Sequence, residues 1–335
     1  MNSAVRWATL SFRLQRWEVA ASVVGVLLLV SAMAWFTWHL RDAGPAQLAC
    51  QQSASTSDCM PALMRFDQLT DTATRLLYLS WAAPFGMGLL LGVPLVAREV
   101  ENRTSAIAWT LSRSRLAWLG SRLAFVGLVL VVLLAAIAVA SEALATALLP
   151  TLDLDADFTW HGRRGWLVVA RGLAALGIGL LVGALIGRVL PALLAAAFAS
   201  VLIFTAVSIG MDRWNESEAV LSAFAAGPEM GDSLAGGLTI GGRIELASGE
   251  LVSWEYLNRQ GYEQQMIDMD GAIYTRFDEQ TGEPDESSFI GWDRMLVVPG
   301  PMYPVVVLRE SGVATGVALL FGLLAARVVV RRRVG

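Results

Sequence analysis

Long apolar runs constrain this chain most, because about 18 or more apolar residues in a row form a helix that can span a bilayer. Hydrophobic residues make up 55% of the chain and charged residues only 16%, against about 45–50% and about 25% in soluble domains. The sequence therefore predicts an all-α integral membrane protein with six transmembrane helices. They are expected at approximately Val19–Trp38, Leu76–Ala97, Leu123–Leu149, Trp166–Gly187, Leu190–Gly210 and Val305–Val330.

The first run also has features of a secretory signal peptide. Arg13 and Arg16 precede it, and Ala32-Met33-Ala34 has the small-residue pattern of a cleavage site. The run is long for a signal core, however, and it continues into an aromatic cluster ending at Trp38, as expected at a membrane interface. We therefore expect an uncleaved span.

Arginine is unevenly divided between the segments that join the spans. It is frequent before the first run, between 98 and 122, at Arg188 and in the tail at 327–333, whereas most carboxylates fall in the other connections. Since cytoplasmic loops carry the excess of basic residues, both termini are expected in the cytoplasm. The segments rich in carboxylates are then extracytoplasmic.

The composition excludes several functions. All 25 basic residues are arginine, so the chain lacks the lysine that a P-loop uses to bind nucleotide phosphates. ATP and magnesium would have to bind a partner ATPase, and we expect no cofactor, metal site or catalytic residue in this chain. Its two cysteines and two histidines are too few for the usual zinc site. A membrane-embedded hydrolase or transferase stays open as a less favoured alternative, in which His161 would serve as the base.

Both cysteines fall in the first predicted outer loop. Cys50 and Cys59 would lie in an oxidising compartment, where a disulfide can persist. We expect a bond that stiffens this loop; a redox switch is the alternative.

The inner loop at about 98–122 is amphipathic, with tryptophan, leucine and isoleucine interleaved with arginine. A short helix there would lie at the membrane surface. It could bind lipid headgroups, or it could dock a cytoplasmic protein.

Two features inside the spans are candidates for function. Gly179, Gly183 and Gly187 recur every four residues, which allows helices to pack closely. Glu142 and Arg171 are ionisable groups within spans and could form a pair across two helices, although both could also extend to the interface.

The chain divides into three parts by this pattern. Residues 1–210 hold the first five spans, 211–304 form an extracytoplasmic subdomain, and 305–335 hold the sixth span and a basic tail. Short runs at Leu238–Ile240, Arg243–Leu246 and Leu251–Tyr256 predict β-hairpins in the subdomain, with a turn at 247–250.

Three stretches resemble the ABC-2 type permease family, in particular its six-span bacterial members. The first has an acidic segment followed by an arginine-bearing turn, the second is a glycine-rich span with an arginine hairpin, and the third leads into the last helix. They are Arg98–Thr104 with Leu111–Arg115, Leu176–Arg188 with Leu190-Pro191-Ala192, and Pro299–Tyr303 running to Glu310.

The resemblance implies a type V exporter-like permease in the bacterial cell membrane. Its partners would be two copies of an ABC ATPase, a second permease that is identical or homologous, and the bilayer, with no nucleic acid. The family's coupling helix would map near Glu99–Arg115, so the resemblance implies contact with the ATPase by Glu99, Glu101, Arg103, Arg113 and Arg115. The alternative class is a membrane sensor or scaffold with an extracytoplasmic ligand-binding loop.

Overall fold

The computed structural model describes residues 3–52, 59–103, 114–223, 236–262, 265–267, 271–276 and 283–332. In these ranges, six helical segments are long and apolar enough to cross a membrane, and each predicted run lies in one of them to within one residue at its end. They are α1 (Ser3–Gln52), α2 (Met60–Gly92) continuing into α3 (Pro94–Glu101), α5 (Arg115–Leu148), α6 (Trp166–Ile186), α7 (Val189–Glu216) and α9 (Tyr303–Arg331).

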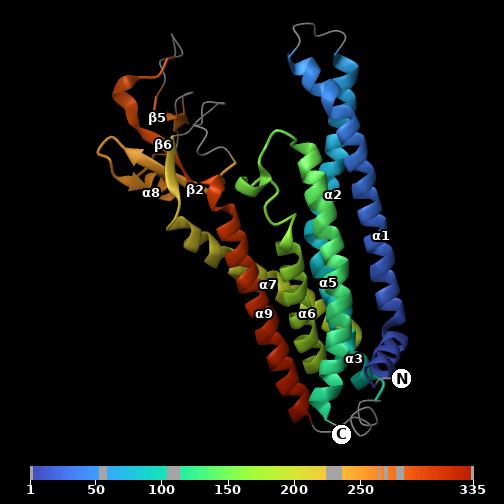
Figure 1. The fold of residues 1–335 in the computed structure, drawn as a ribbon. Helices are drawn as coiled ribbons and strands as arrows, with labels where there is room; N and C mark the ends of the chain where they lie inside the picture. The colour runs from blue at the N-terminus through green and yellow to red at the C-terminus, as the bar shows by residue number, and fades with distance from the viewer. Residues whose placement is uncertain are drawn as a thin grey trace. The chain divides into compact units, whose positions relative to one another are not determined.

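The chain forms two compact units. One contains residues 1–152, 160–207 and 307–335 and holds most of the helical residues; the other contains 153–159 and 208–306 and holds the strands. In the helical unit α1 lies beside α2 and α5, as Figure 1 shows, and α2 packs closely along α6. Its core is built from valine, leucine and isoleucine side chains such as Val26, Leu91, Leu130 and Val168.

Many large apolar side chains of the helices point outward. Leu28, Val139, Leu194, Phe198 and Leu323 are each more than 60% exposed. A soluble protein rarely presents so continuous an apolar exterior, whereas lipid tails solvate such side chains well. The arrangement fits helices that bury one face against each other and turn the other toward the bilayer.

Helices α2 and α6 approach until their backbones touch. A side-chain carbon added at Gly88 of α2 would lie 2.5 Å from the carbonyl oxygen of Gly172 in α6. One added at Gly183 of α6 would lie 2.6 Å from the carbonyl oxygen of Val93, at the junction of α2 and α3. The predicted glycine spacing therefore serves packing within one chain at Gly183, and Gly179 faces Val93 as well. Gly187 instead ends α6 in the left-handed conformation, with φ of 68°.

Replacing Gly183 by alanine is expected to destabilise the helical unit by about 1–3 kcal/mol, because the backbone at Val93 has to move. Gly25 in α1 is the matched control, since nothing lies within 4 Å of an added carbon there. Unfolding of both purified variants in detergent measures the difference. Equal stabilities of the Gly183→Ala and Gly25→Ala proteins would show that this close contact does not form.

In the described residues, the second unit contains an antiparallel sheet of six strands, with β6 at its centre. β6 (Phe289–Val298) pairs with β2 (Leu238–Leu246), β1 (Val220–Ala223) and β5 (Ala272–Tyr274). The edges are β3 (Leu251–Val252), paired with β2, and β4 (Met266–Ile267), paired with β5. Buried Ile244, Val252, Leu257 and Ile273 form its core.

The predicted strands at Leu238–Ile240 and Arg243–Leu246 join into β2, and the turn at 247–250 is present. The strand expected at Leu251–Tyr256 stops at Val252, where Ser253 caps the short helix α8 (Trp254–Arg259) by accepting from the amide of Tyr256. The hydroxyl of a serine before a helix satisfies an otherwise unpaired amide, which favours the helix here.

The first outer loop is shorter than predicted. Helix α1 continues to Gln52 and α2 begins at Met60, so much of the segment expected as loop is helical. The structure joins Cys50, near the end of α1, to Cys59, just before α2, in a disulfide. The bond therefore links the ends of two helices rather than two points of a long loop.

Candidate functional site

Three charged residues on the last turn of α3 each bond to a different helix. Arg98 pairs with Glu18 of α1, and the Glu99 carboxylate accepts from Arg122 of α5 at 2.8 Å. Glu101 accepts from the backbone amide of Val189, the first residue of α7, at 2.9 Å. We call Glu18, Arg98, Glu99, Glu101 and Arg122 the α3 cluster. It ties the short helix to three of the spans.

The Glu99–Arg122 pair is the buried part of the α3 cluster. The two residues are 8% and 7% exposed, and the Arg122 guanidinium lies 4.6 Å from the ring centre of Trp118, which is itself buried. Water cannot solvate either charge in such surroundings. The Arg122 guanidinium is therefore stabilised by the Glu99 carboxylate and by the cation–π contact with Trp118. The ion pair fixes the rotation of α3 against α5.

Two arginines extend the connections to α9 and α6. Arg115 donates to the carbonyl oxygens of Val330 and Arg332, at 2.9 and 2.6 Å. Arg332 in turn donates to the carbonyl oxygen of Ala184 in α6. Cations at helix C-termini satisfy the last carbonyls and complement the helix dipole. The helix ends near α3 are therefore connected through charged side chains.

The residues predicted for ATPase contact have different places in the structure. Arg103 is exposed, directly after α3, and has φ of 57°. Glu101 and Arg115 bond within the chain as described, and Arg113 lies outside the described residues. The buried position of Glu99 does not fit a surface contact: its carboxylate faces Arg122 instead.

The predicted amphipathic loop at about 98–122 is divided between two helices and a segment outside the described residues. Its beginning is the end of α3, and from Arg115 onward it is the first part of α5, capped by Ser114, whose hydroxyl accepts from the amide of Ala117. Residues 104–113 lie outside the described ranges, so the predicted surface helix there stays a prediction.

A second polar cluster lies where α6 begins. Glu310 of α9 is 3.0 Å from the imidazole Nε2 of His161 and 3.4 Å from the guanidinium of Arg171. Arg171 also donates to the carbonyl oxygen of Gly162 at 2.7 Å. The three side chains are 13–18% exposed. We call His161, Arg171 and Glu310 the α6 cluster; it joins α6 to α9.

The predicted pair of Glu142 with Arg171 does not form. Glu142 bonds Arg164 at 2.6 Å, and Arg171 bonds Glu310. The reason is the turn before α6, where Trp160, Gly162 and Gly165 all have positive φ. This turn directs Arg164 toward Glu142, which the pattern of apolar runs did not indicate.

Sequence reasoning missed Glu18 and Arg122 as structural partners. Arg122 was counted only among the arginines at 98–122, and Glu18 was not considered. The signal was present for Arg122, because Trp118, Leu119 and Val126 surround it at helical spacing and indicate a buried face. No such signal marks Glu18, whose partner lies 80 residues away in the sequence.

The six apolar helical segments of the described residues, joined by charged side chains at their ends, define a multi-pass membrane protein. Residues 23–214, more than half of the chain, match the family described as ABC-2 membrane transporter related. The chain belongs to this family, as its sequence features predict, and is a membrane permease of an ABC transporter. Such permeases are in general non-catalytic transmembrane subunits that associate with an ABC ATPase. Searches of curated proteins and of solved structures gave no match.

Proposed function

We propose that this permease couples ATP hydrolysis by a separate ABC ATPase subunit to export of a substrate. The working assembly contains two permease chains, identical or homologous, and two ATPase subunits, in the arrangement of a type V exporter. It lies in the bacterial cell membrane with both termini in the cytoplasm. ATP and magnesium bind the partner, and this chain supplies the pathway and the mechanical connection to it.

The observation that carries this proposal is the α3 cluster. Because Arg98, Glu99 and Glu101 bond to α1, α5 and α7, a displacement of α3 acts on three spans at once. Packed helices tend to move as rigid elements between discrete arrangements rather than to deform continuously. A partner that pushes on the segment after α3 would therefore shift several spans together.

Arg103 is the described residue best suited to contact the ATPase. It is exposed and comes two residues after Glu101, so a force on it reaches the α3 cluster directly. Arg103 thus keeps the contact role that the resemblance implies, whereas Glu99 and Glu101 act as positioning residues for α3.

The charge at this end of the helices supports the proposed orientation. Arg98, Arg115, Arg122 and Arg332 all belong to the connections near α3. The excess of arginine favours the cytoplasmic side for this end. An ATPase that works on cytoplasmic ATP would meet α3 there.

Affinity purification of the full-length chain from its native membranes, followed by mass spectrometry, tests the proposal. We expect a stoichiometric protein with a Walker motif. Its recovery should fall at least about tenfold in Arg103→Glu, since like charges across an interface cost several kcal/mol. Arg75→Glu is the control, because Arg75 is an exposed residue paired only with Asp71 among the described residues. Recovery of the chain without any ATPase would overturn the proposal and favour a sensor or scaffold.

A further inference from the structure

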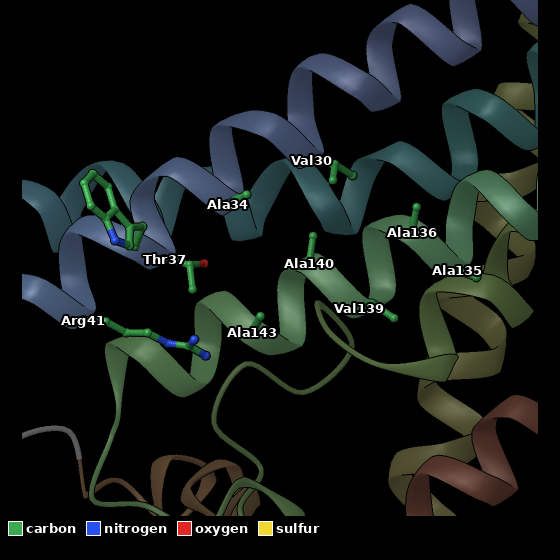
Figure 2. A pocket seen from close by; sticks show the side chains of 10 residues that line it. Val30, Ala34, Thr37, Arg41, Ala135, Ala136, Val139, Ala140 and Ala143 are labelled. Carbon is green, nitrogen blue, oxygen red and sulfur yellow. The ribbon is translucent and has the colours of Figure 1, made fainter.

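A groove of about 650 Å³ runs between α1 and α5. Figure 2 shows its two walls, formed by side chains that recur at helical spacing on each helix. From α1 come Val30, Ala34, Thr37, Trp38 and Arg41, and from α5 come Ala135, Ala136, Val139, Ala140 and Ala143. The groove lies within the apolar spans of both helices, so its natural surroundings are lipid.

Small side chains on α5 create the groove. Nearer the start of both helices, Val26, Val126 and Leu130 fill the space between α1 and α5. From Ala135 onward α5 presents mainly alanine on this face, and the two helices no longer fill the gap. The groove is open to the surroundings of the helices, so molecules of the bilayer can enter it.

The walls are apolar along almost their full length. The one hydroxyl, that of Thr37, donates to the carbonyl oxygen of Met33 at 2.8 Å and is therefore satisfied within α1. From Val30 to Arg41 the groove spans about 16 Å at the α-helical rise per residue. That is roughly half the ~30 Å hydrocarbon thickness of a bilayer, the length available to the acyl chain of one leaflet.

One end of the groove is positively charged. Arg41 is exposed, and it makes no hydrogen bond or ion pair with any residue in the described ranges. In Figure 2 its side chain extends from α1 toward α5, on the side of Ala143. Trp38, one turn earlier, is 69% exposed, as is typical of tryptophan at the level of the lipid headgroups.

We propose that the groove binds one anionic phospholipid of the surrounding bilayer. An acyl chain lies against the alanine face of α5, and the headgroup phosphate pairs with Arg41. Guanidinium groups bind phosphate through paired hydrogen bonds, and the low dielectric at the interface strengthens this contact. The charge of Arg41 favours a lipid anion over a helix from a second copy of the chain, which would need an acidic residue at the same point. This inference does not depend on the proposed ATPase coupling.

Native mass spectrometry of the purified chain, released from nanodiscs that contain equal amounts of phosphatidylglycerol and phosphatidylcholine, tests it. We expect one phosphatidylglycerol to remain bound. Arg41→Gln should weaken its binding about fivefold, the factor that corresponds to ~1 kcal/mol for one arginine at an anionic surface. Ala140→Leu should remove it, because the larger side chain fills the groove.

Two control variants make the same changes of charge and size at positions outside the groove. Arg65→Gln removes an exposed arginine of α2, and Ala197→Leu enlarges an exposed position of α7. Both are expected to retain the lipid. Equal binding of both lipid types, or unchanged binding in Arg41→Gln and Ala140→Leu, would overturn the proposal. So would a dimer that carries no lipid and that Ala140→Leu dissociates, because a second copy would then occupy the groove.

Discussion

Replacement of Glu99 by alanine is expected to destabilise the helical unit by about 3–5 kcal/mol. The change leaves the Arg122 guanidinium buried without its carboxylate, and a lone buried charge is far more costly than the pair itself. Unfolding of the purified protein in detergent, followed by circular dichroism, measures the loss. The exposed pair Arg75–Asp71 is the control, since Arg75→Ala should change stability by less than about 1 kcal/mol.

A second variant separates the charge from general packing. In Glu99→Leu/Arg122→Met both charges are replaced by apolar groups of similar length, and most of the stability should return. If the double variant is as unstable as Glu99→Ala, the loss comes from packing around Trp118 and not from an unpaired charge. With the ATPase bound, the same double variant should hydrolyse ATP but transport poorly, because α3 has lost its charged connection to α5.

The six spans could be predicted because the bilayer imposes a simple requirement on composition and length. Their ends could not be predicted from hydropathy alone. Helices α1 and α2 continue well beyond the apolar runs, to Gln52 and from Met60, because a helix stays stable in water where its polar residues face the solvent. Hydropathy indicates which residues lie in the hydrocarbon region of the bilayer, but it does not indicate where a helix ends.

Which charges meet depends on how each span is rotated about its axis. Apart from Arg171, α6 is apolar and has no polar face from which that rotation could be read, so Glu142 and Arg171 were matched by depth alone. The positive-φ turn before α6 instead brings Arg164 to Glu142. Glycine spacing was more informative, because a close helix contact needs small residues wherever it occurs, as at Gly183.

The α6 cluster gives the other large expected effect. Arg171→Leu should destabilise the helical unit by about 3–5 kcal/mol, because Glu310 and the carbonyl of Gly162 both lose the donor that Arg171 supplies. His161→Ala should cost less, about 1–3 kcal/mol, since Arg171 still faces the carboxylate. Unfolding of the two variants in detergent measures which of them loses more stability.

A double variant tests whether the Arg171–Glu310 pair causes the large loss of stability in Arg171→Leu. Arg171→Leu/Glu310→Leu removes both charges and should recover part of the stability lost in Arg171→Leu, because the Gly162 carbonyl and the His161 imidazole still lose the partners described above. If the two single replacements at Arg171 and Glu310 simply add, the residues do not interact and α6 and α9 are joined by apolar packing alone. A measured coupling would instead make the α6 cluster the counterpart of the α3 cluster: it would join α6 to α9 through charged side chains, as the α3 cluster joins α3 to α1, α5 and α7.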